Sequence, residues 1–248
     1  MKNRAEKLAL LSEPTAVAGD RALDSTAAPG SDVAELVGQL RADIVQARYG
    51  ADEPLRFRAL ANAYGAGVST LREALARLAG EYLVEFRPNQ GFRVAAVSVE
   101  DLIDIMQASS EIERVALRQS IDSGDDHWEA EIVAAHHRLL LTQSRLENGR
   151  SSEAAQEWEV RHREFHQALI AGCRSRWLIR FCEMLRIQCD RYRHLVSVPP
   201  SDYPRLVVHH APLMEAALAR DPDRACRLLA THVEESANVI LAALGKPK

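Results

Sequence analysis

Apolar and polar positions alternate most informatively between Leu55 and Val94. Apolar residues recur at helical intervals until Gly65 and Gly67 interrupt the pattern. A second run of apolar residues then follows at i, i+3, i+7 and i+10. The first spacing comprises Leu60, Ala63 and Tyr64, and the second comprises Val68, Leu71, Leu75 and Leu78. Because two short helices across a glycine-bearing turn form a helix-turn-helix, this segment predicts that motif.

The residues after the second helix favour a β-hairpin. Two β-prone runs, 82–86 and 92–94, flank the turn Arg87-Pro88-Asn89-Gln90-Gly91. A helix-turn-helix followed by a hairpin has the element order of a winged helix. We therefore predict a winged helix over residues 31–97, in which a first helix at 31–48, capped by Ser31 or Asp32, braces the other two.

The rest of the chain follows simpler patterns. Residues 1–30 mix small, polar and charged residues with proline and glycine, which is typical of a flexible tail. Residues 98–244 show helical spacing without a credible strand, over 99–123, 127–148, 152–172, 175–197, 202–220 and 223–244. Since short loops favour antiparallel neighbours, we predict a mainly α protein with an all-α antiparallel helical bundle after the winged helix.

Composition and charge narrow the possible functions. The chain has 248 residues, is 47% hydrophobic and carries a net charge of −4, so it is not a general nucleic-acid-binding polycation. Eight arginines balance eight acids between residues 32 and 95, which counts against DNA binding. DNA binding there requires Arg58, Arg72, Arg87 and Arg93 to share one face and two copies of the chain to bind together.

Cysteine spacing and hydropathy indicate the compartment. Cys173, Cys182, Cys189 and Cys226 show no CxxC spacing and are interpreted as buried, reduced thiols. No signal peptide and no apolar run of membrane length is found. We therefore expect a cytoplasmic protein without a membrane partner.

The second helix of the predicted motif carries candidate DNA contacts. Ser69, Thr70 and Arg72 point away from its apolar stripe. A recognition helix places its N-terminal residues in the major groove, where arginine suits guanine or phosphate and hydroxyls suit phosphates. The alternative is an ordinary helix start with a solvated arginine, and the adjacent hairpin favours DNA contact.

Four histidines of the bundle form a candidate metal site. His162 and His166 are four residues apart and face the same way, while His210 and His232 belong to later helices. Imidazoles that converge inside a bundle can bind a divalent metal, and the alternative is buried histidines bonded to neighbours. The segment His162-Arg-Glu-Phe-His166 is not a metalloprotease helix, because its Glu164 points away from the histidine pair.

The run V-S-T-L-R-E-A-L-A-R-L from Val68, followed by a glycine-bearing wing, resembles the GntR family of bacterial transcription regulators. The resemblance implies DNA contacts by Arg58, Arg72, Ser69 and Thr70 and a wing tip at Gly91. The neighbouring wing residues Asn89, Gln90 and Arg93 complete our set of DNA-binding candidates. A related group of regulators carries arginine where this chain has Val68.

The bundle resembles the FCD effector domain of one GntR branch, which carries a D-x-x-F-H pattern and two later histidines. The resemblance implies a metal held by His166, His210 and His232, with His162 in place of the aspartate. Losing that negative charge favours zinc, or nickel as an alternative. An arginine that meets an effector carboxylate in this family corresponds to Ser109. Arg191, Tyr192 and Arg193 are the candidates for the missing anchor, and the alternative is that they form a solvated basic face.

These observations predict a DNA-binding transcription regulator, a repressor, that acts as a homodimer on double-stranded operator DNA. The resemblance, which is nearest to a branch tied to glutarate and carbon-starvation metabolism, implies a small organic acid as effector. The alternative is a histidine-rich helical metalloenzyme with an accessory winged helix. Four protein ligands without a nearby base argue against an enzyme, because catalytic metal sites keep an open position.

Overall fold

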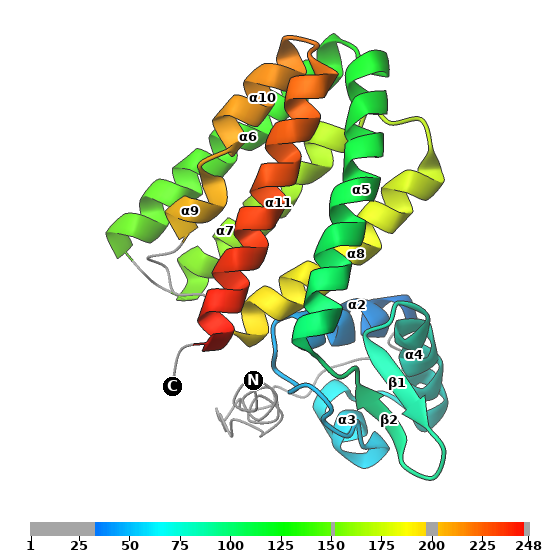
Figure 1. Ribbon diagram of the computed structural model, residues 1–248. Helices are drawn as coiled ribbons and strands as arrows, with labels where there is room; N and C mark the ends of the chain where they lie inside the picture. The colour runs from blue at the N-terminus through cyan, green and yellow to red at the C-terminus, as the bar shows by residue number, and fades with distance from the viewer. Residues whose placement is uncertain (1–32, 150–151, 197–202, 246–248) are drawn as a thin grey trace. The chain divides into compact units, whose positions relative to one another are not determined.

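The computed structural model describes residues 33–149, 152–196 and 203–245 (Figure 1). The expected flexible tail at 1–30 and the capping residues Ser31 and Asp32 lie outside these ranges. The chain divides into two compact units. The first is Met1–Val99 with Asp190–Leu195, and the second is Glu100–Cys189 with Val196–Lys248.

The first unit contains three helices and one hairpin among its described residues. They are α2 (Val33–Val45), α3 (Phe57–Tyr64), α4 (Val68–Gly80), β1 (Val84–Arg87) and β2 (Gly91–Val94). Helix α2 packs on α4 through a stripe that includes Leu36, Leu40 and Ile44. Gly65 ends α3 with φ of 63°, a left-handed conformation that glycine adopts without steric cost. The helix-turn-helix prediction is confirmed.

The hairpin is antiparallel, with Val84 opposite Val94 and Phe86 opposite Phe92. Its turn needs positive φ at Asn89 (63°) and Gly91 (79°), which are residue types that tolerate this region. Phe92 is buried and contacts the rings of Phe57 and Phe86, with centroid distances of 6.2 and 5.2 Å. The hairpin therefore packs against α3, which completes the predicted winged helix.

The apolar stripe of α4 differs from the predicted one at its first residue. Leu71, Leu75 and Leu78 are fully buried together with Ala74, whereas Val68 is 52% exposed. The buried stripe of α4 thus begins at Leu71, one turn after its first residue.

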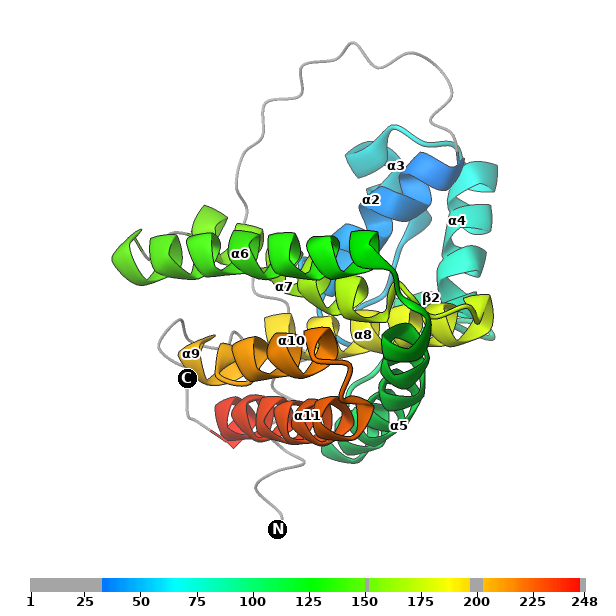
Figure 2. The same ribbon diagram turned by 90° about the horizontal axis from the view of Figure 1, so that it is seen from above.

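The second unit is helical throughout its described residues. Its elements are α5 (Val99–Ser123), α6 (Asp126–Gly149), α7 (Ser152–Ile170), α8 (Arg176–Leu195), α9 (Tyr203–Val207), α10 (His210–Leu218) and α11 (Pro222–Gly245). The end of α8, Asp190–Leu195, belongs to the first unit. Helix α6 lies along α7, and α10 lies along α11 (Figure 2). The predicted helical domain is confirmed.

One expected helix, 202–220, is divided into α9 and α10 by a turn at Val208 and His209. Proline at position 212 explains the break. Its nitrogen cannot donate to the carbonyl of Val208, and its ring would clash with that carbonyl in a continuous helix. The break makes His210 the first residue of a new helix.

All four cysteines are free and buried, as predicted. In the parts of the chain that the structure describes, no helix is both long and apolar enough to cross a membrane.

Candidate DNA-binding surface and metal centre

The exposed side of α4 carries the predicted recognition residues. Ser69 and Arg72 are exposed and Thr70 is half-buried, opposite the buried leucines. The guanidinium of Arg72 lies over the ring of Phe57, 5.8 Å from its centroid. Arg58 is exposed on α3, and within the described residues neither arginine pairs with an acid. These two cations remain available to phosphates or bases.

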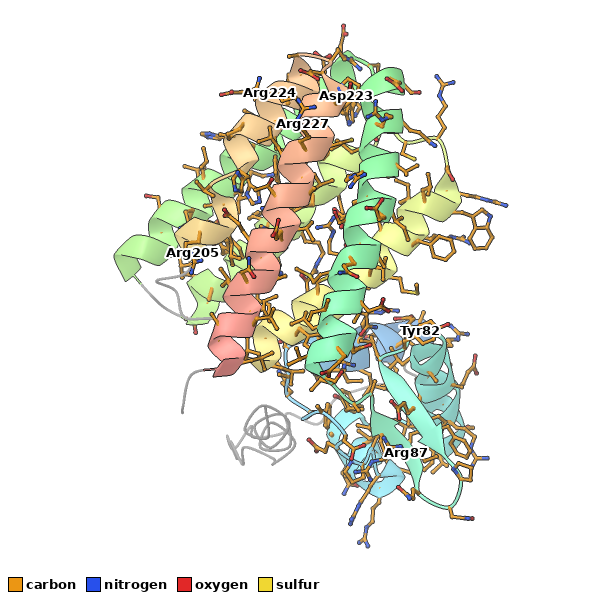
Figure 3. All side chains as sticks on the ribbon, in the orientation of Figure 1. Tyr82, Arg87, Arg205, Asp223, Arg224 and Arg227 are labelled. Carbon is orange, nitrogen blue, oxygen red and sulfur yellow. The ribbon has the colours of Figure 1, made fainter. Side chains whose placement is uncertain are left out.

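The other two arginines of the expected basic face are engaged within the protein. Arg93 donates to the carboxylate of Asp52 at 3.1 Å and to the backbone carbonyl of Asp52. Arg87, which is labelled in Figure 3, lies on the hairpin. It pairs with Asp52 at 2.8 Å and with Glu85 at 3.0 Å. A hydrogen bond from Arg93 is the main reason that the pKa of Asp52 is lowered. The basic face is therefore smaller than the sequence suggests.

The tip of the wing offers polar groups rather than charge. Asn89 and Gln90 are exposed, and Gly91 follows them at the start of β2.

Sequence analysis overlooked Arg56, which is exposed immediately before α3 and, among the described residues, has no acidic partner. Its position two residues before Arg58 could have marked it as a further DNA-binding candidate.

Four histidines from three helices converge inside the second unit. His162 and His166 come from α7, His210 from α10 and His232 from α11. All four are buried, and the ligand atoms they offer lie within 4.8 Å of one another. Their ring centroids are 4.7 to 6.0 Å apart. The fold thus brings together the four residues named from the sequence.

The protonation and bonding of this cluster suit a metal ion. Both ring nitrogens of His166 and of His210 are buried without a hydrogen-bond partner. Burial, with the positive charge of Arg186 and the neighbouring histidines, holds the pKa of His166 and of His210 well below the usual 6.5. Neutral imidazoles with unsatisfied nitrogens are the form that coordinates divalent transition metals. The residues therefore fit a metal ion.

Aromatic side chains enclose the cluster on the α7 side. The Trp158 ring stacks on His162 with a centroid distance of 4.6 Å, and Phe165 lies 4.8 Å from His210. Glu164 instead bonds to Arg161 at 3.0 Å. It is therefore engaged in an ion pair with Arg161.

A buried ion pair that sequence analysis overlooked lies close to the histidines. Arg186 of α8 and Glu113 of α5 approach to 2.8 Å, with side chains only 9% and 4% exposed. Ser109, an expected effector residue, donates to Glu113 at 2.8 Å. Arg186 acts on the pKa of both His166 and His210, so its charge lies near the cluster. The signal in the sequence was its helical spacing from the apolar Cys182 and Cys189.

The three residues expected to anchor an effector have other contacts. Arg191 donates to the carbonyl of Ala96 at 2.9 Å, and the Tyr192 hydroxyl accepts from Ser98 N and donates to Ser98 O, at 3.0 and 3.1 Å. Arg193 pairs with Asp190 at 2.5 Å. All three are buried and belong to the first unit with their partners. The end of α8 thus holds the backbone that precedes α5.

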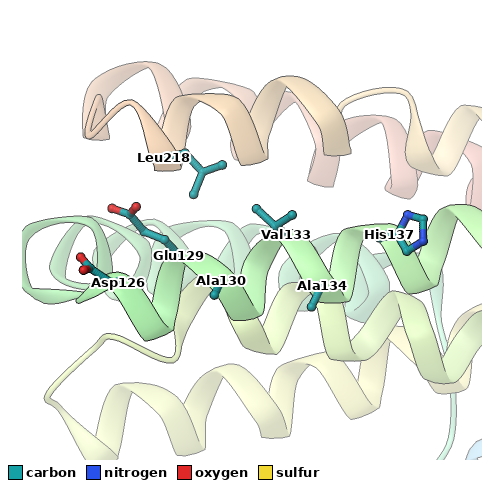
Figure 4. Close-up of a pocket in the computed structure, with 7 residues that line it drawn as sticks. All are labelled: Asp126, Glu129, Ala130, Val133, Ala134, His137 and Leu218. Atoms are coloured by element: carbon teal, nitrogen blue, oxygen red, sulfur yellow. The ribbon is translucent and has the colours of Figure 1, made fainter.

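A groove of about 610 Å³ runs along α6 and reaches Leu218 (Figure 4). It is lined by small and apolar residues, with Asp126, Glu129 and His137 at the edge. None of the predicted metal or effector residues lines it, so it is not the candidate site.

A winged helix with exposed arginines on α4 and α3, joined to a helical domain with a buried histidine cluster, defines the class of DNA-binding regulators. Comparison with known proteins agrees. Residues 33–94 match the bacterial regulatory proteins of the gntR family, and residues 104–235 match the FCD domain. The chain belongs to the GntR family of transcription regulators and carries an FCD domain.

Two relatives support this assignment over nearly the whole chain. The uncharacterized HTH-type transcriptional regulator BphR of Paraburkholderia xenovorans is 36% identical over 90% of this chain and 92% of its own length. The HTH-type transcriptional repressor GlaR of Escherichia coli is 36% identical over 83% of this chain and 94% of its own. Because the family and both relatives are transcriptional regulators, the alternative of a metalloenzyme is rejected.

Solved structures show the same fold. Escherichia coli McbR/YncC superposes with a TM-score of 0.72 at 19% identity, over 85% of this chain and 97% of that one. A putative GntR regulator from Rhodococcus sp. RHA1 gives a TM-score of 0.69 at 19% identity with the same coverage.

Proposed function

We propose that this DNA-binding regulator is a homodimeric repressor whose operator affinity falls when a small carboxylate binds beside a metal ion. Residues 31–97 bind DNA, and residues 98–244 bind the effector and dimerise. A helix-turn-helix dimer reads two half-sites about one helical turn apart. The Escherichia coli relative is named a repressor, which supports the sign of regulation.

The observation that carries the proposal is the buried cluster of His162, His166, His210 and His232. In a protein without a metal, leaving the ring nitrogens of His166 and His210 buried and unbonded costs free energy. Coordination by one nitrogen of each ring removes part of this penalty. Because four neutral imidazoles supply no negative charge, the set favours zinc or nickel over hard, oxygen-seeking ions.

The effector's carboxylate is the anion that this site lacks. A divalent ion held by neutral ligands keeps its full charge. The positive charge of Arg186 lies near the cluster and is balanced by the carboxylate of Glu113. We assign the effector contacts to Arg186 and Ser109, which meet at Glu113 in the helical unit, because the charge of Arg186 lies near the histidine cluster. Arg191, Tyr192 and Arg193 are not assigned, because they belong to the first unit. Arginine's planar fork suits a carboxylate. The bound metal would polarise and hold one carboxylate oxygen.

Elemental analysis tests the metal site. Protein purified without a histidine tag is expected to contain about one zinc or nickel ion per chain. The double variant His166→Ala/His210→Ala is expected to lose it. His137→Ala is the matched control, because His137 lies in the groove on α6 and outside the cluster. A stoichiometric metal that persists in the double variant would show that other residues hold it.

Calorimetric titration tests the coupling to DNA. An effector that weakens operator binding by some factor must itself bind more weakly, by the same factor, when operator is present. Coupling of about 1–3 kcal/mol is typical of such regulators, which corresponds to a fivefold to 150-fold change. Equal effector affinities with and without operator would contradict the proposal, even if metal and DNA binding were each observed.

A further inference from the structure

Val68 is an exposed apolar residue for which the DNA-binding surface described above has no role. It is the first residue of α4, it follows the extended Gly67, and its side chain is 52% exposed. The buried side of the helix starts at Leu71. A single exposed valine is ordinary on a protein surface, so its surroundings decide what it can contact.

Those surroundings favour a polyanion. Val68 and Arg72 are four residues apart, so they are neighbours on one face of α4. Arg72 and Arg58 are exposed and, in the described part of the chain, unpaired with acids. The N-terminus of α4 adds the positive end of a helix dipole. Double-stranded DNA fits this surface better than an apolar protein partner, because exposed arginines pair well with phosphates and base acceptors.

We propose that Val68 contacts the C5-methyl group of a thymine in the major groove and sets the sequence preference at that base pair. Thymine alone among the four bases presents a methyl group there, and apolar side chains are its matching contacts. Valine has no hydrogen-bond donor with which to read guanine or adenine. Arginine would favour guanine at this position, so a Val68→Arg substitution would change which base is preferred.

The position of the thymine follows from the helix geometry. Four residues of α-helix advance by about 6 Å, and successive base pairs are about 3.4 Å apart. The thymine read by Val68 therefore lies within about two base pairs of the guanine or phosphate that Arg72 contacts. This inference rests on the proposed placement of α4 in the major groove.

The test removes the methyl group alone. A duplex that binds the full-length protein is selected from a random library, and each thymine is replaced in turn by deoxyuridine. At one thymine per half-site, uracil is expected to weaken wild-type binding about fourfold, the equivalent of one buried methyl group. The same replacement should weaken the binding of Val68→Ala less than twofold, because alanine lacks the two methyl groups of valine that reach toward the base. Alanine has the higher helix propensity, so this variant is expected to fold.

Val160→Ala is the matched control, since Val160 is a similarly exposed valine (45%) on α7, and it should respond to uracil as the wild type does. If no thymine is sensitive, or if the sensitive one remains so in Val68→Ala, the inference is overturned. Arg72→Ala separates this outcome from a failure of the larger proposal. Should Arg72→Ala weaken binding while no thymine couples to Val68, only the role of Val68 falls. Unchanged binding by Arg72→Ala would reject the whole surface.

Discussion

Replacing Glu113 by glutamine tests the buried ion pair and the effector site together. Glu113 and Arg186 are 4% and 9% exposed and lie 2.8 Å apart. Removing one partner of a buried pair costs about 3–5 kcal/mol, because the other charge stays buried and uncompensated. The amide oxygen of glutamine keeps an acceptor for Arg186 and Ser109, which recovers about 1 kcal/mol. We expect a net loss of about 2–4 kcal/mol.

Denaturant or thermal unfolding measures this loss. In a protein of this size, 1 kcal/mol shifts Tm by about 2–4 °C, so Glu113→Gln should lower it by roughly 4–16 °C. Glu157→Gln is the matched control, since Glu157 is 39% exposed and pairs with Arg145 and Arg161 at the surface. A surface pair contributes only about 0–1 kcal/mol. Ser109→Ala removes one hydrogen bond and should fall between the two.

The same variant has a second readout that concerns ligand binding. In the wild type, Arg186 must give up part of its contact with Glu113 to meet a carboxylate, whereas in Glu113→Gln it is already uncompensated. A small carboxylate that stabilises the wild type should therefore raise the Tm of the variant more, because a ligand stabilises by RT ln(1 + [L]/Kd). A stability loss below about 1 kcal/mol would refute the estimate for the ion pair. Equal Tm shifts of variant and wild type with such a carboxylate would refute Arg186 as the anchor.

Three further outcomes are expected. Arg72→Ala should cost about 1–3 kcal/mol of binding free energy on operator DNA. Arg58→Ala should weaken binding to all DNA sequences alike and reduce the slope of log affinity against log salt concentration by about one. Arg93→Ala should change that slope less, because the Arg93 guanidinium is bound to Asp52, and gel-shift titrations at several salt concentrations check all three variants. In metal-free protein the pKa values of His166 and His210 are lowered, so below pH 6.5 the unfolded chain binds more protons than the folded one. The free energy of unfolding should therefore fall as the pH drops from 7 to 5. A free energy of unfolding that stays constant over this range would contradict the prediction. Burial raises the pKa of Cys182 to about 12, so this thiol should resist alkylation at pH 8 until the protein is unfolded, as peptide mapping by mass spectrometry can show.

Local signals were enough to predict most of the secondary structure. The break at Ser123-Gly-Asp-Asp ends α5 at the predicted residue, and the glycines at 65 and 91 mark the turn and the wing. These features depend on backbone preferences of neighbouring residues, which a sequence displays directly. The division of the helix expected at 202–220 was also local in origin, because Pro212 causes it.

Side-chain partners far apart in the chain were decided by tertiary packing. The sequence showed that His162 and His166 share a face, but only the packing of α7, α10 and α11 brings His210 and His232 to them. Helical spacing could not reveal that Glu113 of α5 forms an ion pair with Arg186 of α8. Nor could it reveal that Asp52 forms ion pairs with Arg87 and Arg93. Charge and hydrogen-bond partners depend on distances in space, whereas sequence periodicity reports only which face of its own helix or strand a residue occupies. The sequence by itself thus determined the elements and the candidate residues, and the tertiary structure decided which of those residues remain available to DNA, metal and effector.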